Sequence, residues 1–348
     1  MTLPATLSWD AESEGLHFID QTKLPGRLVM VSCSTVSRLA TAIRRLEIRG
    51  APALGVAGSF GIALAAHRCR KTRREGFLRE VEDAGKILAQ TRPTAVNLSW
   101  GIERTLDAVR RGGSVAEMRD AALSEALTIA CEDEACCHAI GGYGAALLPD
   151  EGTVLTHCNA GALACSAWGT ALGVIRSAVR EGKKIRVIAS ETRPLLQGAR
   201  LTAWELTEDG IDVTVITDSM AAGLMREGKI DCVIVGADRI THDAVFNKIG
   251  TYMHAVCARH HHLPFYVAAP LSTFDPVHSA SEVVIEERGR SEVAACGRIT
   301  TVPKKAAVYN PAFDLTPVDL VSAIVTEKGV LQPPYNLKAF IRSRKTST

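Results

Sequence analysis

Hydrophobic and polar positions follow two different rhythms along the chain. In residues 35–145, apolar residues recur every three or four positions, which is the period of an amphipathic helix. Ser34 or Thr35 stands before the first of these segments and is a typical N-cap residue. We therefore expect a mainly helical N-terminal half, preceded by short strands in residues 1–20. Residues 114–148 predict one long helix or two.

From residue 150 onward, short β-branched runs alternate with helical segments. The runs "GTVLTHC", "KIRVIAS", "DVTVITD" and "KIDCVIVGAD" are each followed by a segment of helical character. Repeated βα units of this kind predict a parallel sheet that is covered by helices on both faces. The sequence therefore indicates an α/β fold in which a helical part precedes the sheet.

Polar groups stand at the ends of four of these predicted strands. In chain order they are Cys158 with Asn159, then Glu191, Asp218 and Asp238. In parallel sheets, ligands bind beyond the carboxyl ends of the strands. Four such ends on one edge favour a ligand site there, although single polar residues commonly terminate strands.

Cys158 and Asp238 are the two candidates for proton transfer. Cys158 lies between a strand and a segment rich in small residues, where the N-terminus of a helix would lower the pKa of a thiol. The alternative for Cys158 is a packed core thiol. Asp238 follows an apolar run, and burial would raise its pKa and keep it protonated as a general acid. The alternative for Asp238 is a helix cap or an ion pair with Arg239.

Three further segments are candidates for holding an anion. Arg49 and Gly50 precede Pro52 at a predicted helix start, where backbone N–H groups and a guanidinium could bind a phosphate. Arg92 also precedes a proline, but an ordinary surface residue is the alternative. Asn247 and Lys248 are predicted to open the next helix, and on general grounds a solvated first turn is favoured there.

Three patterns are assigned no cofactor. Gly55, Gly58 and Gly61 are spaced by three, which does not match the dinucleotide-binding fingerprint and favours a helix face that packs closely. His254, Cys257 and His261 have the spacing of a metal-binding helix face, but no distant partner set is evident. The segment "CEDEACCHAI" is interpreted in the same way as an ordinary helix. We therefore expect neither a metal nor an organic cofactor.

Composition narrows the class of protein. The 348 residues are 47% hydrophobic and 22% charged, which is typical of a globular protein with a large core. The 40 basic and 38 acidic residues give a net charge of +2 without a long internal basic run, so nucleic acid is not an expected partner. No apolar run is long enough for a membrane helix, and no signal peptide is seen. Ten scattered cysteines indicate reduced thiols and a cytoplasmic protein.

Several motifs together resemble one known family. The segments "IRGAPALGVAG", "RPTAVNL", "THCNAGALA", "ETRPLLQGARLTAWEL", "ITDSMAAGLM", "VGADRI", "NKIGTY" and "NPAFDLTPVDLVSAIVTEKG" are similar to those of the methylthioribose-1-phosphate isomerases. The resemblance covers residues from about 35 to 335. It extends to a superfamily that also includes ribose-1,5-bisphosphate isomerases and regulatory subunits of the translation initiation exchange factor.

This resemblance implies a fold, an assembly and a set of site residues. It implies a helical N-terminal domain, residues 1–145, a Rossmann-like C-terminal domain, residues 146–348, and a homodimer with a site between the domains. Its catalytic residues fall on Cys158 and Asp238. Its substrate-binding residues fall on Arg49, Gly50, Ala51, Arg92, Gln197, Asn247 and Lys248. The implied partner is a small sugar phosphate, and no cofactor is implied.

The same resemblance separates an enzyme from a regulatory subunit. Regulatory subunits usually lack the cysteine and the aspartate, and this chain has both, so we expect an aldose–ketose isomerase of a sugar 1-phosphate. The segment "THDAVF" after "GADRI" is one residue shorter than the common form of the isomerases. This difference makes 5-deoxyribose 1-phosphate an alternative substrate. The superfamily offers two further alternatives, an isomerase of ribose 1,5-bisphosphate and a non-catalytic regulatory subunit.

Overall fold

The computed structural model describes residues 4–92, 95–297, 299–337 and 339–340. The chain forms two compact units that interleave along the sequence. The first comprises Met1–Ala139 and Ala160–Gly173, and the second comprises Ile140–Asn159 and Val174–Thr348. The single boundary after residue 145 stays a prediction.

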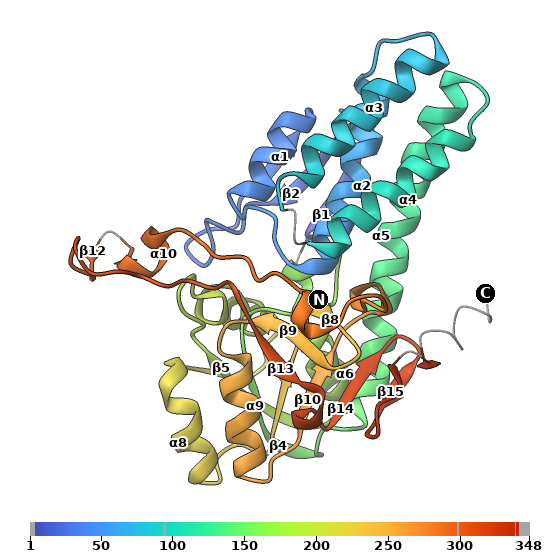
Figure 1. Cartoon of the computed structure of the whole chain (residues 1–348). Helices are drawn as coiled ribbons and strands as arrows, with labels where there is room; N and C mark the ends of the chain where they lie inside the picture. The colour runs from blue at the N-terminus through green and yellow to red at the C-terminus, as the bar shows by residue number, and fades with distance from the viewer. Residues whose placement is uncertain (1–3, 93–94, 298, 338, 341–348) are drawn as a thin grey trace. The chain divides into compact units, whose positions relative to one another are not determined.

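The first unit combines a small sheet with long helices (Figure 1). Strands β1 (Leu7–Asp10), β2 (Gly15–Ile19) and β3 (Met30–Cys33) form an antiparallel sheet. The helices are α1 (Val36–Arg44), α2 (Ala51–Arg68), α3 (Arg74–Ala89), α4 (Val96–Arg111) and α5 (Val115–Ala145), of which α5 continues past Ala139 into the second unit. The expected helices and the early strands are confirmed, and the segment from residue 114 is one long helix. Strand β3 was not foreseen.

Helix α2 is the centre of the first unit. Every residue from Ala53 to Ala66 is buried, so this helix is apolar on all sides. It lies against α4 so closely that a Cβ atom added at Gly101 would be 2.1 Å from the carbonyl oxygen of Gly55. The interpretation of the regularly spaced glycines as a close-packing face is therefore supported. Thr35 caps α1 by accepting a hydrogen bond from the backbone N–H of Arg38. Of the two N-cap residues that the sequence offered, Ser34 and Thr35, the structure therefore has Thr35.

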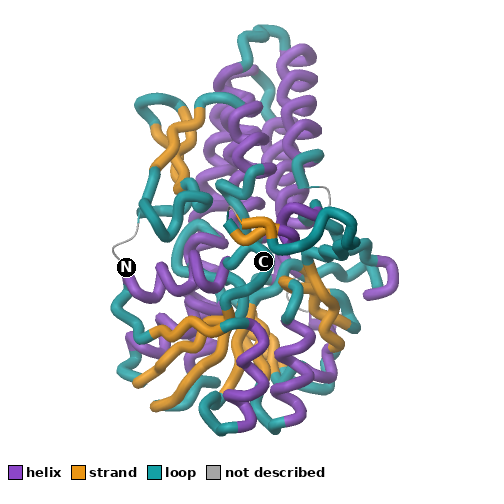
Figure 2. Tube along the Cα trace, turned by 90° about the vertical axis from the view of Figure 1, so that its left-hand side faces the viewer, coloured by secondary structure: helices purple, strands orange, loops and turns teal. Residues whose placement is uncertain are grey.

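The second unit is built on a seven-stranded sheet, and Figure 2 draws strands in orange. Its spatial order is β15 (Gly329–Leu331), β14 (Ala323–Thr326), β10 (Phe265–Ala268), β7 (Cys232–Val235), β4 (Glu151–Thr156), β5 (Lys184–Ser190) and β6 (Val213–Ile216). All neighbouring pairs are parallel except β14 with β15. The helices that follow its strands are α6 (Ala171–Arg180), α7 (Ala203–Glu208), α8 (Ala221–Arg226) and α9 (Thr251–His260). The prediction of a parallel α/β sheet is confirmed.

A second, smaller sheet in this unit was not foreseen. Strands β8 (Arg239–Ile240), β9 (Ala244–Lys248) and β13 (Phe313–Pro317) pair antiparallel in the order β13-β9-β8. A short helix, α10 (Arg290–Ala294), precedes the strand pair β11 (Ala295–Cys296) and β12 (Ile299–Thr300). Within the described part of the chain, no helix has both the length and the apolar character needed to cross a bilayer.

Candidate active site

The parallel sheet brings three of the expected site residues to one edge of the second unit. Strands β7, β4 and β5 are neighbours, and Val154 of β4 is paired with Cys232 of β7. Cys158 follows β4, and Asp238 follows β7, so both leave the carboxyl edge of adjacent parallel strands. Gln197 lies in the segment after β5 on the same edge. The prediction that these strand ends share an edge is confirmed.

The backbone of Cys158 is held on both sides by threonine hydroxyls. Its φ angle is +63°, in the left-handed region that residues other than glycine rarely occupy. Its amide N–H donates to Thr192 Oγ1 at 2.8 Å, and its carbonyl oxygen accepts from Thr202 Oγ1 at 2.6 Å. The side chain itself is half-buried. Two charge-free hydrogen bonds therefore fix an unusual backbone conformation at this cysteine.

In the part of the chain that the structure describes, no α-helix starts directly after Cys158, so this prediction was wrong. A single 3-10 turn, Ala162–Ala164, lies between Cys158 and the start of α6 at Ala171. Trp168 and Gly169 have φ angles of +62° and +87°, which an α-helix cannot contain. A helix that starts directly after Cys158 therefore contributes no dipole to the environment of this residue.

A buried polar network lies beneath Cys158. His157 Nε2 donates to the carbonyl oxygen of Ile249 at 2.8 Å, which leaves Nδ1 of His157 as an acceptor. His254 Nε2 lies 3.2 Å from that Nδ1 and 3.1 Å from Ser190 Oγ. The hydroxyl of Thr192 donates to the Ser190 carbonyl at 3.0 Å. The network thus connects both histidines to the threonine that binds the Cys158 amide.

Both histidines of this network are neutral at physiological pH. Burial lowers the pKa of His157 to about 4, and the nearby charge of Lys248 acts in the same direction. Burial also lowers the pKa of His254 to about 3, with a further contribution from His157. His254 therefore belongs to a hydrogen-bonded core and not to the helix face that its spacing with Cys257 suggested.

Asp238 is fixed by a hairpin. Its backbone N–H donates to the carbonyl oxygen of Phe246 at 2.9 Å, where β8 and β9 begin to pair. The residue is half-buried. Arg239 Nη1 lies 3.5 Å from a carboxylate oxygen of Asp275. The guanidinium of Arg239 thus forms an ion pair with Asp275.

Asn247 and Lys248 do not begin a helix, and this prediction was wrong. They end strand β9, where Asn247 pairs with Asp314 and Lys248 pairs with Phe313 of β13. Both side chains are only 5% exposed. Lys248 Nζ donates to the Ala312 carbonyl at 2.7 Å and lies 4.6 Å from the centre of the Phe313 ring. Pairing with a distant strand, which local sequence does not reveal, determined this conformation.

Asp314 occupies the true start of the helix and was missed at the sequence level. The helix begins at Thr251, after Gly250 with a φ angle of +104°. The Asp314 carboxylate accepts the backbone N–H groups of Gly250 at 2.7 Å and Tyr252 at 3.2 Å. Burial raises the pKa of Asp314 to about 6 although these bonds and Lys248 oppose the shift. An internal carboxylate therefore fills the position that an anionic ligand was expected to take.

Gln197 is positioned by an unusually close backbone contact. Gly198 follows it, and a Cβ atom added there would lie 1.7 Å from the Ser190 carbonyl oxygen and 2.9 Å from Thr192 Oγ1. The Gln197 side chain is 6% exposed. Among the described residues, its buried Oε1 atom has no hydrogen-bond partner. Gln197 thus offers a buried polar atom beside the residues that hold Cys158.

Two of the remaining strand-end residues, Asp218 and Asn159, form hydrogen bonds within the protein. The Asp218 carboxylate accepts the backbone N–H groups of Thr192 at 2.8 Å and Arg193 at 2.7 Å. Asn159 Nδ2 donates to the buried carboxylate of Glu205 at 2.8 Å. These groups shape the loops after β4 and β5.

The other four expected substrate contacts belong to the first unit. Arg49 is 8% exposed, Gly50 has a φ angle of +95°, and Ala51 is the first residue of α2. A Cβ atom at Gly50 would lie 2.5 Å from the Cα atom of Ala164, so only glycine fits there. Arg92 is half-buried beyond the end of α3, and the adjacent residues 93–94 of its motif lie outside the described residues.

The known proteins that resemble this chain in sequence form one group of related proteins. The model of the initiation factor 2 subunit family matches residues 47–333. A methylthioribose-1-phosphate isomerase of Thermosipho melanesiensis is 51% identical, covering 96% of this chain and 97% of that protein. A 5-deoxyribose 1-phosphate isomerase of Moorella thermoacetica is also 51% identical, covering 95% of each.

Solved structures resemble the whole chain. The 5-methylthioribose 1-phosphate isomerase of Pyrococcus horikoshii has a TM-score of 0.92 at 41% identity, covering 100% of this chain and 97% of that one. A structure described as translation initiation factor eIF-2B, subunit delta, from A. fulgidus has a TM-score of 0.88 at 54% identity, covering 98% and 100%. The chain is thus similar over nearly its full length to proteins with two kinds of name.

Proposed function

The chain belongs to the initiation factor 2 subunit family, and we propose that it is an aldose–ketose isomerase that converts 5-methylthioribose 1-phosphate into 5-methylthioribulose 1-phosphate. The observation that carries the proposal is the delivery of Cys158 and Asp238 to one edge by the adjacent parallel strands β4 and β7. Two groups suited to proton movement at one sheet edge are what an isomerase needs. The isomerase names of close relatives supply the substrate class.

The substrate sets the chemical problem. A phosphate on C1 locks the anomeric carbon, so no free aldehyde forms, and the ring must open with the phosphate still attached. In the proposed mechanism, protonated Asp238 donates to the ring oxygen as the bond from C1 to that oxygen breaks. Positive charge then develops at C1, which makes C1 an acceptor for the hydrogen of C2.

Transfer of that hydrogen completes the reaction by one of two routes. In the first, the Cys158 thiolate removes the C2 hydrogen as a proton, and C1 is protonated from an enediol. In the second, the hydrogen moves from C2 to C1 as a hydride while the Cys158 thiolate accepts the proton of the C2 hydroxyl, so that C2 becomes the carbonyl carbon. Exchange with heavy water separates them, because solvent deuterium enters C1 only when the hydrogen leaves as a proton.

The expected binding residues divide the substrate between them. Arg49, Gly50, Ala51 and Arg92 supply guanidinium and backbone N–H groups for the phosphate and hydroxyls. Gln197 brings a buried Oε1 atom without a partner among the described residues, which a sugar hydroxyl would satisfy. Asn247 and Lys248 would make the remaining contacts with the substrate. No step of this mechanism requires a cofactor.

The candidate substrates differ in the substituent at C5. The segment "THDAVF" forms a tight connection in which Thr241 Oγ1 donates to Asp243 at 2.8 Å before β9 begins at Ala244. A relative of equal identity is a 5-deoxyribose 1-phosphate isomerase. 5-Deoxyribose 1-phosphate is therefore the second candidate substrate.

The deciding experiment is an assay of the purified protein on 5-methylthio, 5-deoxy and 5-phospho sugars that carry a 1-phosphate. We expect the highest kcat/KM for the 5-methylthio compound. Preference for the 5-deoxy compound would transfer the assignment to that substrate, and preference for the 5-phospho compound to ribose 1,5-bisphosphate. No turnover on any of the three, with stable binding to an exchange-factor partner, would replace the enzyme by a regulatory subunit.

A further inference from the structure

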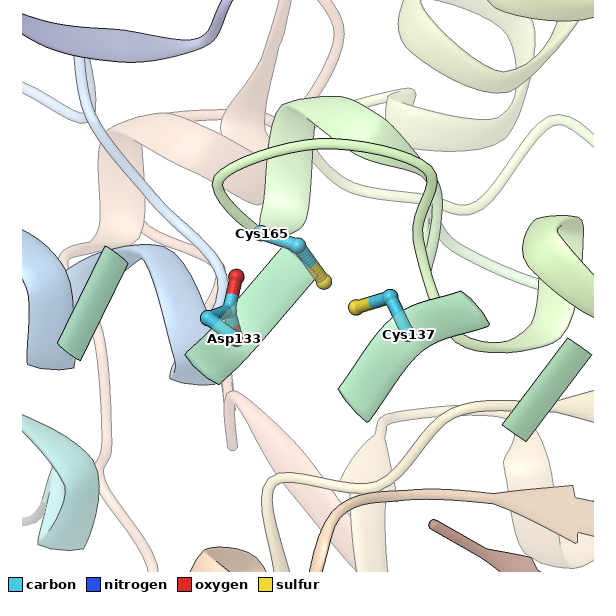
Figure 3. A group of neighbouring side chains, drawn as sticks. All are labelled: Asp133, Cys137 and Cys165. Carbon is cyan, nitrogen blue, oxygen red and sulfur yellow. The ribbon is translucent and has the colours of Figure 1, made fainter. Parts of the chain in front are cut away.

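Three side chains of the first unit converge at a place that the proposed reaction does not use. The carboxylate of Asp133 and the sulfur atoms of Cys137 and Cys165 all lie within 4.8 Å of one another. Figure 3 shows the two sulfur atoms pointing toward each other with the Asp133 carboxylate beside them. Cys137 is 1% exposed and Cys165 is fully buried.

Secondary structure explains how the three groups meet. Asp133 and Cys137 are four residues apart on α5, so their side chains lie on one face of the helix. Cys165 comes from the loop after the 3-10 turn, and its backbone N–H donates to the Ala162 carbonyl at 3.0 Å. The segment "CEDEACCHAI" thus has a distant partner, and its interpretation as an ordinary helix omitted Cys165.

The carboxylate is already oriented toward the loop. The backbone N–H of Ser166 donates to Asp133 Oδ2 at 2.6 Å, directly beside Cys165. A hydrogen bond of this kind orients a ligating carboxylate and is common around metal sites. The aromatic ring of Trp168, in the same loop, stacks on His138 at 4.6 Å between ring centres. The loop is therefore held against α5 by two contacts that follow Cys165 in the chain.

We propose that Asp133, Cys137 and Cys165 form a binding site for one zinc ion. Two thiolates and one carboxylate suit a borderline-soft divalent cation, whereas magnesium and calcium prefer oxygen ligands alone. Three protein ligands leave one tetrahedral position for water or another small ligand. Binding releases the two thiol protons and forms a centre with a net charge of −1, without any change in oxidation state.

The site would stabilise the loop that supports the first-unit substrate contacts. Ala164 precedes Cys165 and lies under Gly50, where a Cβ atom would come within 2.5 Å of the Ala164 Cα atom. A metal on Cys165 would therefore tie α5 to the loop on which Gly50 rests. Its role would be structural, since the isomerase mechanism proposed above needs no metal.

Protons compete with the metal for these ligands. Zinc binds the thiolate form of cysteine and not the thiol. Metal affinity should therefore increase with pH, and each zinc ion bound should release about two protons.

The test is a zinc titration of the full chain after treatment with a chelator and a reductant. We expect one zinc ion per chain, a rise in Tm, and proton release in weakly buffered solution. Cobalt in place of zinc should produce the thiolate charge-transfer and visible bands of a tetrahedral centre. None of these readouts depends on isomerase activity, so the two proposals fail independently.

Variants separate this site from adventitious thiols. Cys137→Ser and Cys165→Ser should abolish the cobalt spectrum, while Cys131→Ser, an exposed cysteine on the same helix, should leave it unchanged, as should Cys158→Ser. Asp133→Asn keeps an acceptor for the Ser166 amide and should preserve the fold. It should weaken zinc binding at least tenfold, because even the loss of a group that only supports a metal ligand typically costs about 10–100-fold. Unchanged zinc binding in these site variants would overturn the proposal. So would a reduced protein that binds no zinc and merely forms a Cys137–Cys165 disulfide in air.

Discussion

At the scale of single residues, the assignment of Asp238 as the general acid is the most direct to test. Asp238→Asn keeps the size of the side chain and removes the transferable proton. We expect kcat to fall by about 10²–10⁴-fold, which is the usual contribution of a positioned acid or base. Asp243→Asn on the same hairpin is the control, because its side chain is 43% exposed. Near-normal kcat for Asp238→Asn, with an unchanged circular dichroism spectrum, would remove this residue from the acid role.

Thr192 provides a second test at this scale, because it holds Cys158 without touching its thiol. Thr192→Val has the same shape but cannot accept the Cys158 N–H, which it now accepts at 2.8 Å. Leaving that buried donor unsatisfied should lower the free energy of unfolding by about 1–3 kcal/mol. Kinetics should show a lower kcat with little change in KM, since the substrate contacts remain.

Thr192→Ser is the matched control, because it restores the hydroxyl. It should recover most of the stability and the kcat of the wild-type protein. A valine variant with wild-type stability and kcat would mean that the hydroxyl does not position Cys158.

At the scale of secondary structure elements, the contact between Gly198 and the end of β5 gives a third prediction. Gly198→Ala would place a methyl group 1.7 Å from the Ser190 carbonyl oxygen. Because the obstacle is backbone, the π-helix Gly198–Thr202 would have to shift, at a cost of about 1–3 kcal/mol or more. Chemical denaturation would measure this loss.

Gly223→Ala in α8 is the control for that measurement. No atom lies within 4 Å of a Cβ atom added at Gly223, so alanine should stabilise the helix by about 0.5–1 kcal/mol. Equal effects of the two substitutions would contradict the close contact at Gly198.

The same scale explains which predictions succeeded. Strands β4, β5, β6 and β7 carry β-branched runs, and α1 carries a helical period with Thr35 as its cap, so local pattern was sufficient. The start of α9 was misplaced because Asn247 and Lys248 pair with β13, more than sixty residues away in the chain. No local signal encodes such a partner.

Some parts of the candidate site could be predicted from the sequence and others could not, for the same reason. Cys158 and Asp238 could be assigned to one edge because parallel strands align their carboxyl ends. The helix expected after Cys158 fails at Trp168 and Gly169, whose positive φ angles depend on the folded loop. The convergence of Cys137 with Cys165 depends on tertiary structure, since the two residues share no local motif.

At the scale of the whole molecule, the pH dependence of stability is set by groups that act in opposite directions. The pKa values of His157 and His254 are lowered to about 4 and about 3, against about 6.5 in the unfolded chain. Below pH 6.5 the unfolded chain therefore binds more protons, and the free energy of unfolding falls as the pH falls. Asp314 acts oppositely, because its folded pKa is about 6, and it binds its proton first in the folded state.

Asp314→Asn isolates this opposing contribution. Asparagine still accepts the backbone N–H groups of Gly250 and Tyr252 but does not titrate. Between pH 7 and pH 4, the wild-type protein should gain about 2 kcal/mol of stability relative to the variant. A shift of about two pKa units at about 1.4 kcal/mol each gives about 3 kcal/mol in full, but the unfolded carboxyl group is only about half protonated at pH 4. The variant should therefore unfold at progressively lower denaturant concentration than the wild type as the solution is acidified. The difference cancels every other titrating group, so parallel curves for the two proteins would show that Asp314 does not titrate as a buried carboxyl group.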